Sequence, residues 1–476
     1  MIGLGTMGRN FLLNVAEHGF SCVGYDLDAA KRKLLLEEGA NMPIDTGDSV
    51  EEFLSRLSTP RNIMLLVPAG QIVDSVIDEL VPHLEQDDLI IDGGNSHFTD
   101  TERRQQALAD KKIAFLGVGV SGGEEGARHG ASIMVGGDPA IYERVRPILE
   151  AASAKVDGEP CAAHVGLGSA GHFVKMVHNG IEYAMMQLIA ETYDLLGKGF
   201  GISDEKAADL FERWNGGELN SFLIEITAVV LRRKDDDGTM LVEKILDTAG
   251  QKGTGKWTSE AALEFGVPIP TIDSAVSMRQ ISALKPQRVA AAQKLGIVQS
   301  VQIDETLGPD VIHFVEAGLH LAFVAAYAQG ISLLQAASAE KNYELDIREI
   351  SKIWRGGCII RSRLLDKIRA AFNANSSLPN LLVADNLRET IQKEQMLLKA
   401  TLKFAIAADI PCMAFGSALN YIKAYASERL PANLIQAQRD LFGAHTYQRI
   451  DMEGTFHTPN WESDKQSDIK ASSSQS

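Results

Sequence analysis

Residues 3–8 are Gly3-Leu4-Gly5-Thr6-Met7-Gly8, a G-x-G-x-x-G turn. A helical pattern follows over residues 9–18, and a strand pattern then ends at Asp26, 26 − 8 = 18 residues after the last glycine. Such glycines let the backbone turn tightly and approach a pyrophosphate at a helix N-terminus, and an acidic residue at the next strand end binds a ribose. The stretch predicts a dinucleotide-binding βαβ unit, with a purely structural Gly-rich turn as the alternative.

Short strand patterns alternate with helical stretches up to about residue 168. The strand patterns cover residues 23–25, 63–67, 89–92, 113–116 and 132–135, each bounded by Gly, Pro, Asp or Asn. This alternation predicts a Rossmann-type α/β domain over residues 1–168, with a parallel, doubly wound sheet. Only Met1 and Ile2 precede the glycine turn, where a strand of about five residues is expected. We therefore expect the natural chain to begin earlier.

The second half of the chain has a different sequence pattern. Residues 169–427 are long amphipathic segments, which predicts an all-α domain. Two landmarks recur there, which indicates an internal repeat unless the agreement is chance. Residues 428–476 are predicted to form a C-terminal tail whose Ser-rich end, 463–476, is disordered. The recurring landmarks are His172-Phe173-Val174 with His313-Phe314-Val315 (313 − 172 = 141) and Trp214-Asn215-Gly216-Gly217 with Trp354-Arg355-Gly356-Gly357 (354 − 214 = 140).

Composition narrows the class of protein. The 476 residues carry a formal charge of −17, which argues against nucleic acid as the main partner. The four cysteines lie far apart and form no zinc-type cluster, so we expect no metal site, no disulfide framework and a cytoplasmic location. We also expect no membrane span, because no apolar run of about 18 residues stands out.

One helical stripe is a candidate site. Lys175, His178, Asn179 and Glu182 fall within an arc of roughly 100° on a helix. Such a polar stripe on an apolar helix faces water, an internal network or a ligand. The second copy weighs against an ordinary wet face, because it lacks the stripe. Its corresponding residues are Glu316, Leu319, His320 and Phe323.

Three further Gly-rich segments are typical of anion-binding sites. Residues 92–95 (Asp-Gly-Gly-Asn) and 118–123 follow strand patterns and should lie at the carboxyl edge of the sheet, where ligands bind. Residues 250–256 match G-x-x-x-x-G-K, but Trp257 stands where a P-loop needs Ser or Thr. We therefore expect a phosphate or carboxylate there, and no ATP site.

Asp26 also bears on the choice of cofactor. A carboxylate accepts hydrogen bonds from a ribose 2′-hydroxyl and repels a 2′-phosphate. Leu27, Asp28 and Ala29, which follow, offer no cation. This favours NAD over NADP, although Asp26 could simply cap the next helix.

Long strings over nearly the whole chain carry a family resemblance. They are G-L-G-T-M-G, I-I-D-G-G-N, G-V-G-V-S-G-G-E-E-G, K-M-V-H-N-G-I-E-Y, K-G-T-G-K-W and L-P-A-N-L-I-Q-A-Q-R-D-L-F-G-A-H-T-Y. The chain resembles the decarboxylating 6-phosphogluconate dehydrogenases, within the β-hydroxyacid dehydrogenase superfamily. The resemblance implies oxidative decarboxylation of 6-phosphogluconate to ribulose 5-phosphate and carbon dioxide, in the pentose phosphate pathway. It also implies a homodimer in which each C-terminal tail completes the partner's active site.

The resemblance assigns roles to individual residues. Lys175 would be the general base and later the acid, and Glu182 would protonate the enediol. Substrate would be held by Asn95, Ser121, Gly122, Gly123, His178 and Asn179, and its phosphate by Tyr183, Lys252, Thr254 and Arg279 with Arg439 and His445 of the other subunit. The cofactor would lie against Gly3, Leu4, Gly5, Thr6, Met7, Gly8, Asp26, Leu27, Asp28, Val67, Pro68, Ala69 and Asn95.

The chain departs from the family pattern in two places. NADP-using relatives carry Asn-Arg-Ser or Asn-Arg-Thr where this chain has Asp26-Leu27-Asp28, and Val-Lys-Ala-Gly where it has Val67-Pro68-Ala69-Gly70. Both changes remove a cation, so we expect NAD to be preferred. Two other functions remain open: a non-decarboxylating hydroxyacid dehydrogenase of the 3-hydroxyisobutyrate type, and a non-catalytic NAD-binding sensor.

Overall fold

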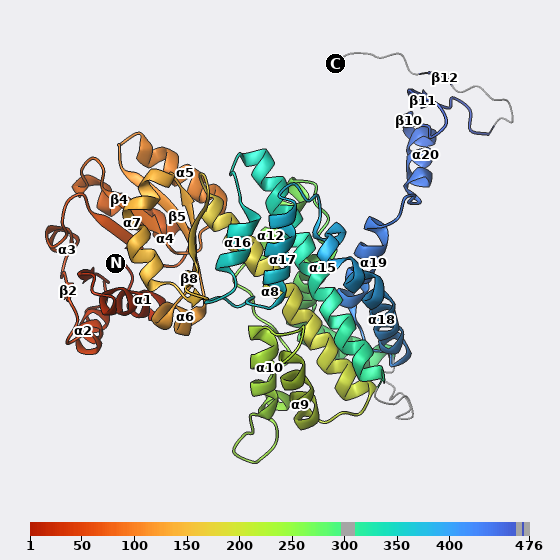
Figure 1. Cartoon of the computed structure of the whole chain (residues 1–476), viewed down its shortest axis with the longest axis horizontal. Coiled ribbons are helices and arrows are strands. Elements are labelled where there is room, and N and C mark those ends of the chain that lie inside the picture. Colours follow the sequence, from red (N-terminus) through yellow and green to blue (C-terminus); the bar gives the residue numbers. More distant parts are fainter. Residues whose placement is uncertain (297–309, 463–468, 471–476) are drawn as a thin grey trace. The chain divides into compact units, whose positions relative to one another are not determined.

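The computed structural model describes residues 1–296, 310–462 and 469–470 (Figure 1). These residues form two compact units, Met1–Leu419 and Asn420–Ser476. The disorder predicted for residues 463–476 therefore falls almost wholly outside the described residues.

The N-terminal part of the first unit is built on a twisted sheet with helices on both faces. A five-stranded sheet has the order β3-β4-β5-β6-β9, and a separate pair joins β1 to β2. Ile2 links the two, because it forms parallel bridges with both Tyr25 and Leu65. The strands are β1 (Cys22–Gly24), β2 (Ile44–Thr46), β3 (Asn62–Leu65), β4 (Leu89–Asp92), β5 (Ala114–Ser121), β6 (Ser132–Gly137), β7 (Lys155–Val156), β8 (Glu159–Pro160) and β9 (Ala162–Gly166). The helices are α1 (Thr6–Glu17), α2 (Ala29–Glu38), α3 (Val50–Ser55), α4 (Gln71–Leu80), α5 (Phe98–Ala109), α6 (Gly123–His129) and α7 (Pro139–Ala152).

All five predicted strands are present, but the sheet is mixed. β5 pairs with β6 in antiparallel register, from Leu116 opposite Gly137 to Ser121 opposite Ser132. The prediction of an all-parallel sheet is wrong at this point. The connection holds only the short helix α6, whereas a parallel crossover needs a dozen or more residues.

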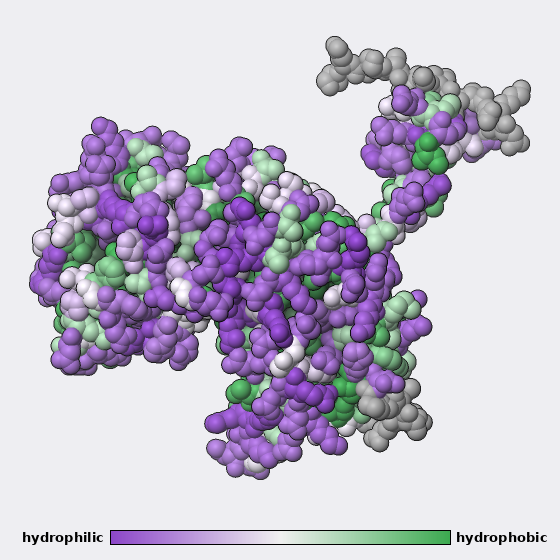
Figure 2. Space-filling model, viewed as in Figure 1, coloured by the Kyte–Doolittle hydropathy of each residue, from purple (hydrophilic) through white to green (hydrophobic). Residues whose placement is uncertain are grey.

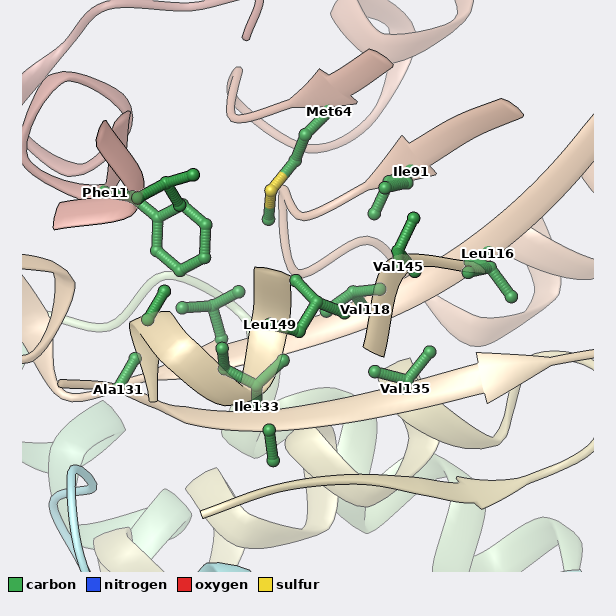
Figure 3. Packing of buried hydrophobic residues seen from close by; sticks show 14 of the residues in the cluster. Phe11, Met64, Ile91, Leu116, Val118, Ala131, Ile133, Val135, Val145 and Leu149 are labelled. Atoms are coloured by element: carbon green, nitrogen blue, oxygen red, sulfur yellow. The ribbon is translucent and has the colours of Figure 1, made fainter. Parts of the chain in front are cut away.

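The sheet is buried on both faces, which explains why its strands are almost continuously apolar. On one face, Phe11 of α1 and Val145 and Leu149 of α7 pack against β3–β6 (Figure 3). On the other face, Phe53 of α3 and Val73 of α4 pack against β1 and β3–β5.

The remainder of the first unit is helical, as predicted. The long helices α8 and α15 lie side by side at its centre (Figure 1). The visible surface of this unit is mostly hydrophilic, with scattered apolar residues (Figure 2). The helices are α8 (Ala170–Asp194), α9 (Asp204–Asn215), α10 (Phe222–Arg232), α11 (Leu241–Lys244), α12 (Thr254–Glu264), α13 (Pro270–Ala283), α14 (Lys285–Leu295), α15 (Asp310–Lys341), α16 (Ile347–Ile353), α17 (Leu364–Ala374), α18 (Arg388–Ala407) and α19 (Met413–Tyr425), which crosses into the second unit.

The helical part repeats itself. α8, α9 and α10 correspond in order to α15, α16 and α17, and a turn containing a fully buried tryptophan, Trp214 or Trp354, closes the second helix of each set. The two copies meet in an antiparallel bridge between Ser221 and Ser362, which are 362 − 221 = 141 positions apart. That separation equals the offset between the sequence landmarks, so the bridge joins equivalent positions.

The sequence-based statement that no apolar run of about 18 residues stands out is wrong for one helix. Helix α15 is long and apolar enough to cross a membrane by composition, with a mean hydropathy of 1.5 over 18 residues. However, 78% of that window is buried inside the protein. Its apolar character follows from packing on all sides against α8, α13 and α18.

The N-terminal α-ammonium group is buried. Met1 N donates a hydrogen bond to Val23 O at 2.7 Å, and burial lowers the pKa of the ammonium to about 5. A cavity of about 570 Å³ lies beside it, lined by apolar residues that include Phe11, Met64 and Leu149.

The second unit has a buried carboxylate, that of Asp440, which connects its segments by hydrogen bonds. It contains α20 (Ala432–Gly443) and the short strands β10 (Tyr447–Gln448), β11 (Thr455–His457) and β12 (Ile469–Lys470). Asp440 is 1% exposed and accepts hydrogen bonds from Thr446 N, Thr458 N and Trp461 Nε1 at 3.0–3.1 Å. It thereby holds the chain after α20 against that helix.

Candidate active site

A cavity of about 1180 Å³ lies at the carboxyl edge of the sheet, between the Gly-rich turn and the helical part. It is lined by Gly5, Thr6, Met7, Gly8, Leu66, Val67, Pro68, Ala69, Gly70, Gly93, Gly94, Asn95, His97, Asp100 and Val120 from the α/β part and by Asn179, Glu182, Tyr183, Gly250, Gln251, Lys252, Thr254, Trp257 and Arg279 from the helical part. The predicted cofactor and substrate segments therefore share one cavity.

The Gly-rich turn has the shape that a dinucleotide requires. A Cβ on Gly8 would lie 1.8 Å from Gly3 O, and Gly3 has a φ of +92°, so both positions need glycine. A Cβ on Gly5 would meet no atom within 4 Å. The N-terminus of α1 follows without a side-chain cap. Backbone N–H groups next to open space fit a pyrophosphate.

Asp26 closes the turn. Its carboxylate accepts hydrogen bonds from Leu4 N at 2.8 Å and from Asp28 N at 3.0 Å, and Lys31 Nζ lies 3.3 Å away. Although burial opposes ionisation, these contacts hold the pKa of Asp26 below its usual value. Asp26 thus supports the glycine turn in addition to facing any ribose.

The expectation that no cation lies near Asp26 is wrong. Lys31 and Arg32, in the first turns of α2, both reach it, because the helix brings residues five and six positions ahead back over the strand end. Arg32 is already engaged, donating to Asp26 O at 2.5 Å and to the Asp48 carboxylate at 3.1 Å.

The predicted stripe on α8 forms a compact network around Lys175. Lys175 Nζ lies 2.7 Å from Asn179 Oδ1, 3.0 Å from Ser121 Oγ and 3.2 Å from His178 Nδ1. Lys175 is 6% exposed and His178 is fully buried. Gly119 on β5 allows this approach, because a Cβ there would lie 2.4 Å from Lys175 Cβ.

The roles of the two His178 ring nitrogens depend on which of them carries the proton. With the proton on Nδ1, the ring donates to Asn179 Oδ1 at 3.0 Å, and Nε2 accepts from the Ser121 hydroxyl at 3.3 Å. Ser121 Oγ then accepts from the Lys175 amine. This arrangement connects the amine to a neutral imidazole through one hydroxyl.

Burial shifts the titration of all three ionisable groups in the stripe. Burial lowers the pKa of Lys175, opposed by Glu182 and the Cys358 thiol. Burial and the neighbouring Lys175 lower the pKa of His178 well below its usual value. Burial raises the pKa of Glu182, opposed by Lys175 and Arg279. Burial thus moves the pKa of the amine and the pKa of the carboxyl toward each other, which is a shift suited to acid–base chemistry.

The second repeat supports the loop that carries Ser121. A Cβ on Gly122 would lie 2.5 Å from Gly357 O, which itself accepts a hydrogen bond from Ser132 N at 2.8 Å. The ring of Trp354 meets the His178 ring edge-on, with centroids 5.7 Å apart. Gly122 and Gly123 both have positive φ angles, as the start of α6 requires.

Asn95 connects two strand ends. Its side chain donates to Val120 O at 3.3 Å and accepts from Val120 N at 3.2 Å, so it ties the loop after β4 to the end of β5. Asn95 itself lines the cavity and has a φ of +54°.

A cationic end lies across the cavity from the sheet. The Arg279 guanidinium stacks 3.5 Å from the centroid of the Tyr183 ring and donates to Gly250 O at 3.0 Å. Lys252 is exposed, and Thr254 begins α12 and accepts from Asn179 Nδ2 at 3.1 Å. Two cations and a helix N-terminus suit a phosphate.

Two further predicted residues lie outside the unit that contains this cavity. Arg439 and His445 belong to the second unit. Both are exposed; Arg439 donates to Gln436 Oε1 and the His445 ring contacts Phe442.

Sequence reasoning missed three side chains that line the cavity. His97, Asp100 and Trp257 flank the predicted motifs, and the His97 ring meets the Trp257 indole edge-on at 4.9 Å. The sequence could have indicated these three residues, because they are close in the chain to the D-G-G-N and K-G-T-G-K segments.

Comparisons with known proteins cover the whole chain. Residues 1–166 match the family model of the NAD binding domain of 6-phosphogluconate dehydrogenase, and residues 171–461 match that of its C-terminal domain. A Bacillus subtilis protein named 6-phosphogluconate dehydrogenase, NADP(+)-dependent, decarboxylating is 48% identical over 96% of this chain and 98% of its own length. The decarboxylating 6-phosphogluconate dehydrogenase of Escherichia coli is 46% identical over the same shares. The solved Plasmodium falciparum 6-phosphogluconate dehydrogenase superposes with a TM-score of 0.93 at 41% identity, covering 96% of this chain and 99% of that one. This chain belongs to the 6-phosphogluconate dehydrogenase family.

Proposed function

We propose that the protein oxidises and decarboxylates 6-phosphogluconate to ribulose 5-phosphate and carbon dioxide, with NAD as its preferred oxidant. The buried Lys175 amine carries this proposal, because it donates at 2.7 Å to Asn179, which lines a cavity that also contains a dinucleotide turn and a cationic end. The four free cysteines support a reducing compartment such as the cytoplasm.

Lys175 serves as the base of the oxidation. Because burial lowers the pKa of Lys175, its amine loses a proton more readily than that of an exposed lysine, and the neutral amine can take the proton of the 3-hydroxyl while hydride leaves C3. A bound nicotinamide ring would accept that hydride. The contacts of Lys175 with Ser121 and Asn179 keep its Nζ in one place.

The same residue then serves as an acid. The 3-keto acid loses its carboxyl group as carbon dioxide once the ketone is polarised, and the Lys175 ammonium can donate its proton to the ketone oxygen as the C1–C2 bond breaks. The product is an enediol. Glu182, whose pKa burial raises, donates a proton to the former C2, which becomes C1 of the product. The enediol hydroxyl at C3 returns its proton to Lys175, and transfer of that proton from the Lys175 ammonium to the Glu182 carboxylate restores the starting state.

Other residues hold the substrate. Ser121, Gly122, Gly123, His178 and Asn95 surround the expected position of the carboxylate and hydroxyls. Arg279, Lys252, Tyr183 and Thr254 form the phosphate end. Tyr183 follows Lys175 by 183 − 175 = 8 residues on α8, a rise of about 12 Å along the helix axis at about 1.5 Å per residue.

Lys175→Met tests the assignment. This variant should abolish turnover while cofactor binding, measured by isothermal titration calorimetry, persists. A control variant, Lys198→Met, removes an exposed lysine that pairs with Asp194 at the end of α8. It should retain activity. Substantial turnover by Lys175→Met would refute the role of the lysine.

The preference for NAD is supported by Asp26. Its carboxylate is held at the strand end by two backbone N–H groups and faces the region next to the glycine turn. Arg32 is committed to other oxygens, and Lys31 pairs with Asp26 itself. The Bacillus subtilis relative is named NADP-dependent. Steady-state rates with NAD and NADP at equal concentration decide between the two cofactors.

We further propose a homodimer in which Arg439 and His445 reach the partner's phosphate end. Exposed apolar side chains on α20, including Leu434, Ile435 and Phe442, support burial of this helix against another chain. Subunit mixing tests the proposal. Arg439→Ala and Lys175→Met should each be inactive, yet co-refolded together they should recover activity, because one site of the mixed dimer then contains both wild-type residues. No recovery would contradict a shared site.

A further inference from the structure

Arg104 is a buried cation behind the cavity. It lies on α5, is 2% exposed, and is not among the residues that line the cavity. Burying a guanidinium is costly unless its N–H groups find acceptors. The identity of those acceptors therefore indicates what the residue is for.

The guanidinium contacts three separate segments. Nη2 donates to Gly70 O at 2.9 Å, in the loop after β3. Nη1 donates to Ser96 Oγ at 2.9 Å and to Asp92 Oδ2 at 3.2 Å, at the two ends of the loop after β4. Nε donates to Asp74 Oδ1 at 2.8 Å, on α4. A single planar group thus joins two loops and a helix.

The two joined loops form one wall of the cavity. Residues 66–70 and 93–95 both line it. They are in close contact, because a Cβ on Gly94 would lie 2.8 Å from Val67 O. Asp92 also accepts from Gly94 N at 3.0 Å, so the carboxylate that Arg104 holds shapes the loop directly. Asn95, next in the chain, ties this loop to β5 and hence to Ser121.

We propose that Arg104 is a positioning residue for hydride transfer: it clamps the loops after β3 and β4, so that the nicotinamide and the substrate carbon meet at a reactive distance. This inference rests on the proposed dehydrogenase activity. Lysine cannot replace the residue, because one ammonium cannot reach acceptors on opposite sides as a guanidinium fork does. A displacement of about 1 Å at reacting atoms can cost a hundredfold in rate.

The test compares Arg104→Lys and Ser96→Ala with the wild-type enzyme. Ser96→Ala removes one of the contacts with a smaller change, so it serves if Arg104→Lys fails to fold. We expect kcat to fall about tenfold to a hundredfold in Arg104→Lys and less in Ser96→Ala. The deuterium isotope effect with substrate labelled at C3 should rise, because hydride transfer becomes slower than the other steps. The Kd for NAD, from calorimetry, should increase in both variants.

Arg103→Lys is the matched control. Arg103 neighbours Arg104 on α5, is largely exposed, and also pairs with Asp74. It should leave kcat, the isotope effect and NAD binding unchanged. Guanidinium ions added to Arg104→Ala should restore part of its kcat.

The outcomes separate two kinds of failure. If the wild-type enzyme does not oxidise 6-phosphogluconate with either cofactor, the proposed function fails, and the NAD affinities of the variants still test the clamp. If the wild-type enzyme is active and both variants merely melt at lower temperature, with unchanged kcat, isotope effect and Kd, Arg104 is only structural and the inference is overturned.

Discussion

Changing Asp26 and Leu27 together should reverse the cofactor preference. Asp26→Asn removes a negative charge beside the ribose, and Leu27→Arg adds a cation at a position that is 84% exposed. A carboxylate and a phosphate charge about 5 Å apart repel by about 3 kcal/mol at an effective dielectric constant of about 20. Salt reduces this figure, and a new charge-assisted hydrogen bond adds about 1.5–3 kcal/mol. The ratio of kcat/KM for NADP to that for NAD should therefore rise about 10²–10³-fold.

The structure also predicts a cost of this double change. The carboxylate of Asp26 accepts from both Leu4 N and Asp28 N, whereas an amide has only one oxygen to offer. One of these N–H groups loses its partner, at about 1 kcal/mol. Affinity for NAD should consequently fall more than removal of the ribose contact alone would cause. Lys31, released from its pairing with Asp26, adds to the attraction for a 2′-phosphate.

The assay is initial-rate absorbance of the reduced nicotinamide at saturating 6-phosphogluconate, over a range of each cofactor. Asp45→Asn is the control, since it removes the same charge from β2, where Asp45 pairs with Arg56. Its ratio should stay within about twofold of the wild-type value, as expected for an exposed ion pair. A double variant whose ratio does not move, or a control whose ratio moves equally, would refute the assignment of specificity to Asp26.

Two other predictions follow from burial. First, kcat/KM should fall on the acid side of the pH–rate profile as Lys175 becomes protonated, and this should occur below the usual lysine pKa because burial lowers the pKa of Lys175. The profile should also fall on the alkaline side as Glu182, whose pKa burial raises, loses its proton, and Glu182→Gln should remove that alkaline fall. Gly119→Ala should cost about 1–3 kcal/mol in urea unfolding and displace Lys175, because its Cβ would lie 2.4 Å from Lys175 Cβ; an unchanged kcat would contradict the packing described.

Local patterns were sufficient for most of the architecture. The strands were predictable because burial on both faces makes them continuously apolar, and the α8 stripe because helical spacing places Lys175, His178 and Asn179 on one side. The roles of Lys175 and Glu182 came from family resemblance rather than from spacing. The pKa shifts that support these roles depend on burial, which a sequence does not state.

The errors have a common physical origin. The direction of β6 depends on the length of the segment that connects it to β5. The apolar character of α15 depends on how many helices surround it. The presence of cations beside Asp26 depends on where α2 begins. Each is decided by three-dimensional neighbours rather than by local composition. Arg104 is a further example, because nothing in the segment Thr101–Gln105 distinguishes it from the exposed Arg103.

The contact between Gly122 and Gly357 bears on how a duplicated unit diverges. The first copy carries the reactive side chains on α8, whereas the corresponding positions of α15 include Leu319 and Phe323. The Trp-x-Gly-Gly turn of the second copy nevertheless supports the site of the first, because its Gly357 carbonyl and Trp354 indole contact Gly122 and His178. Substitutions at Gly357 should therefore be as rare among descendants of this gene as substitutions at Lys175, although Gly357 takes no part in the chemistry.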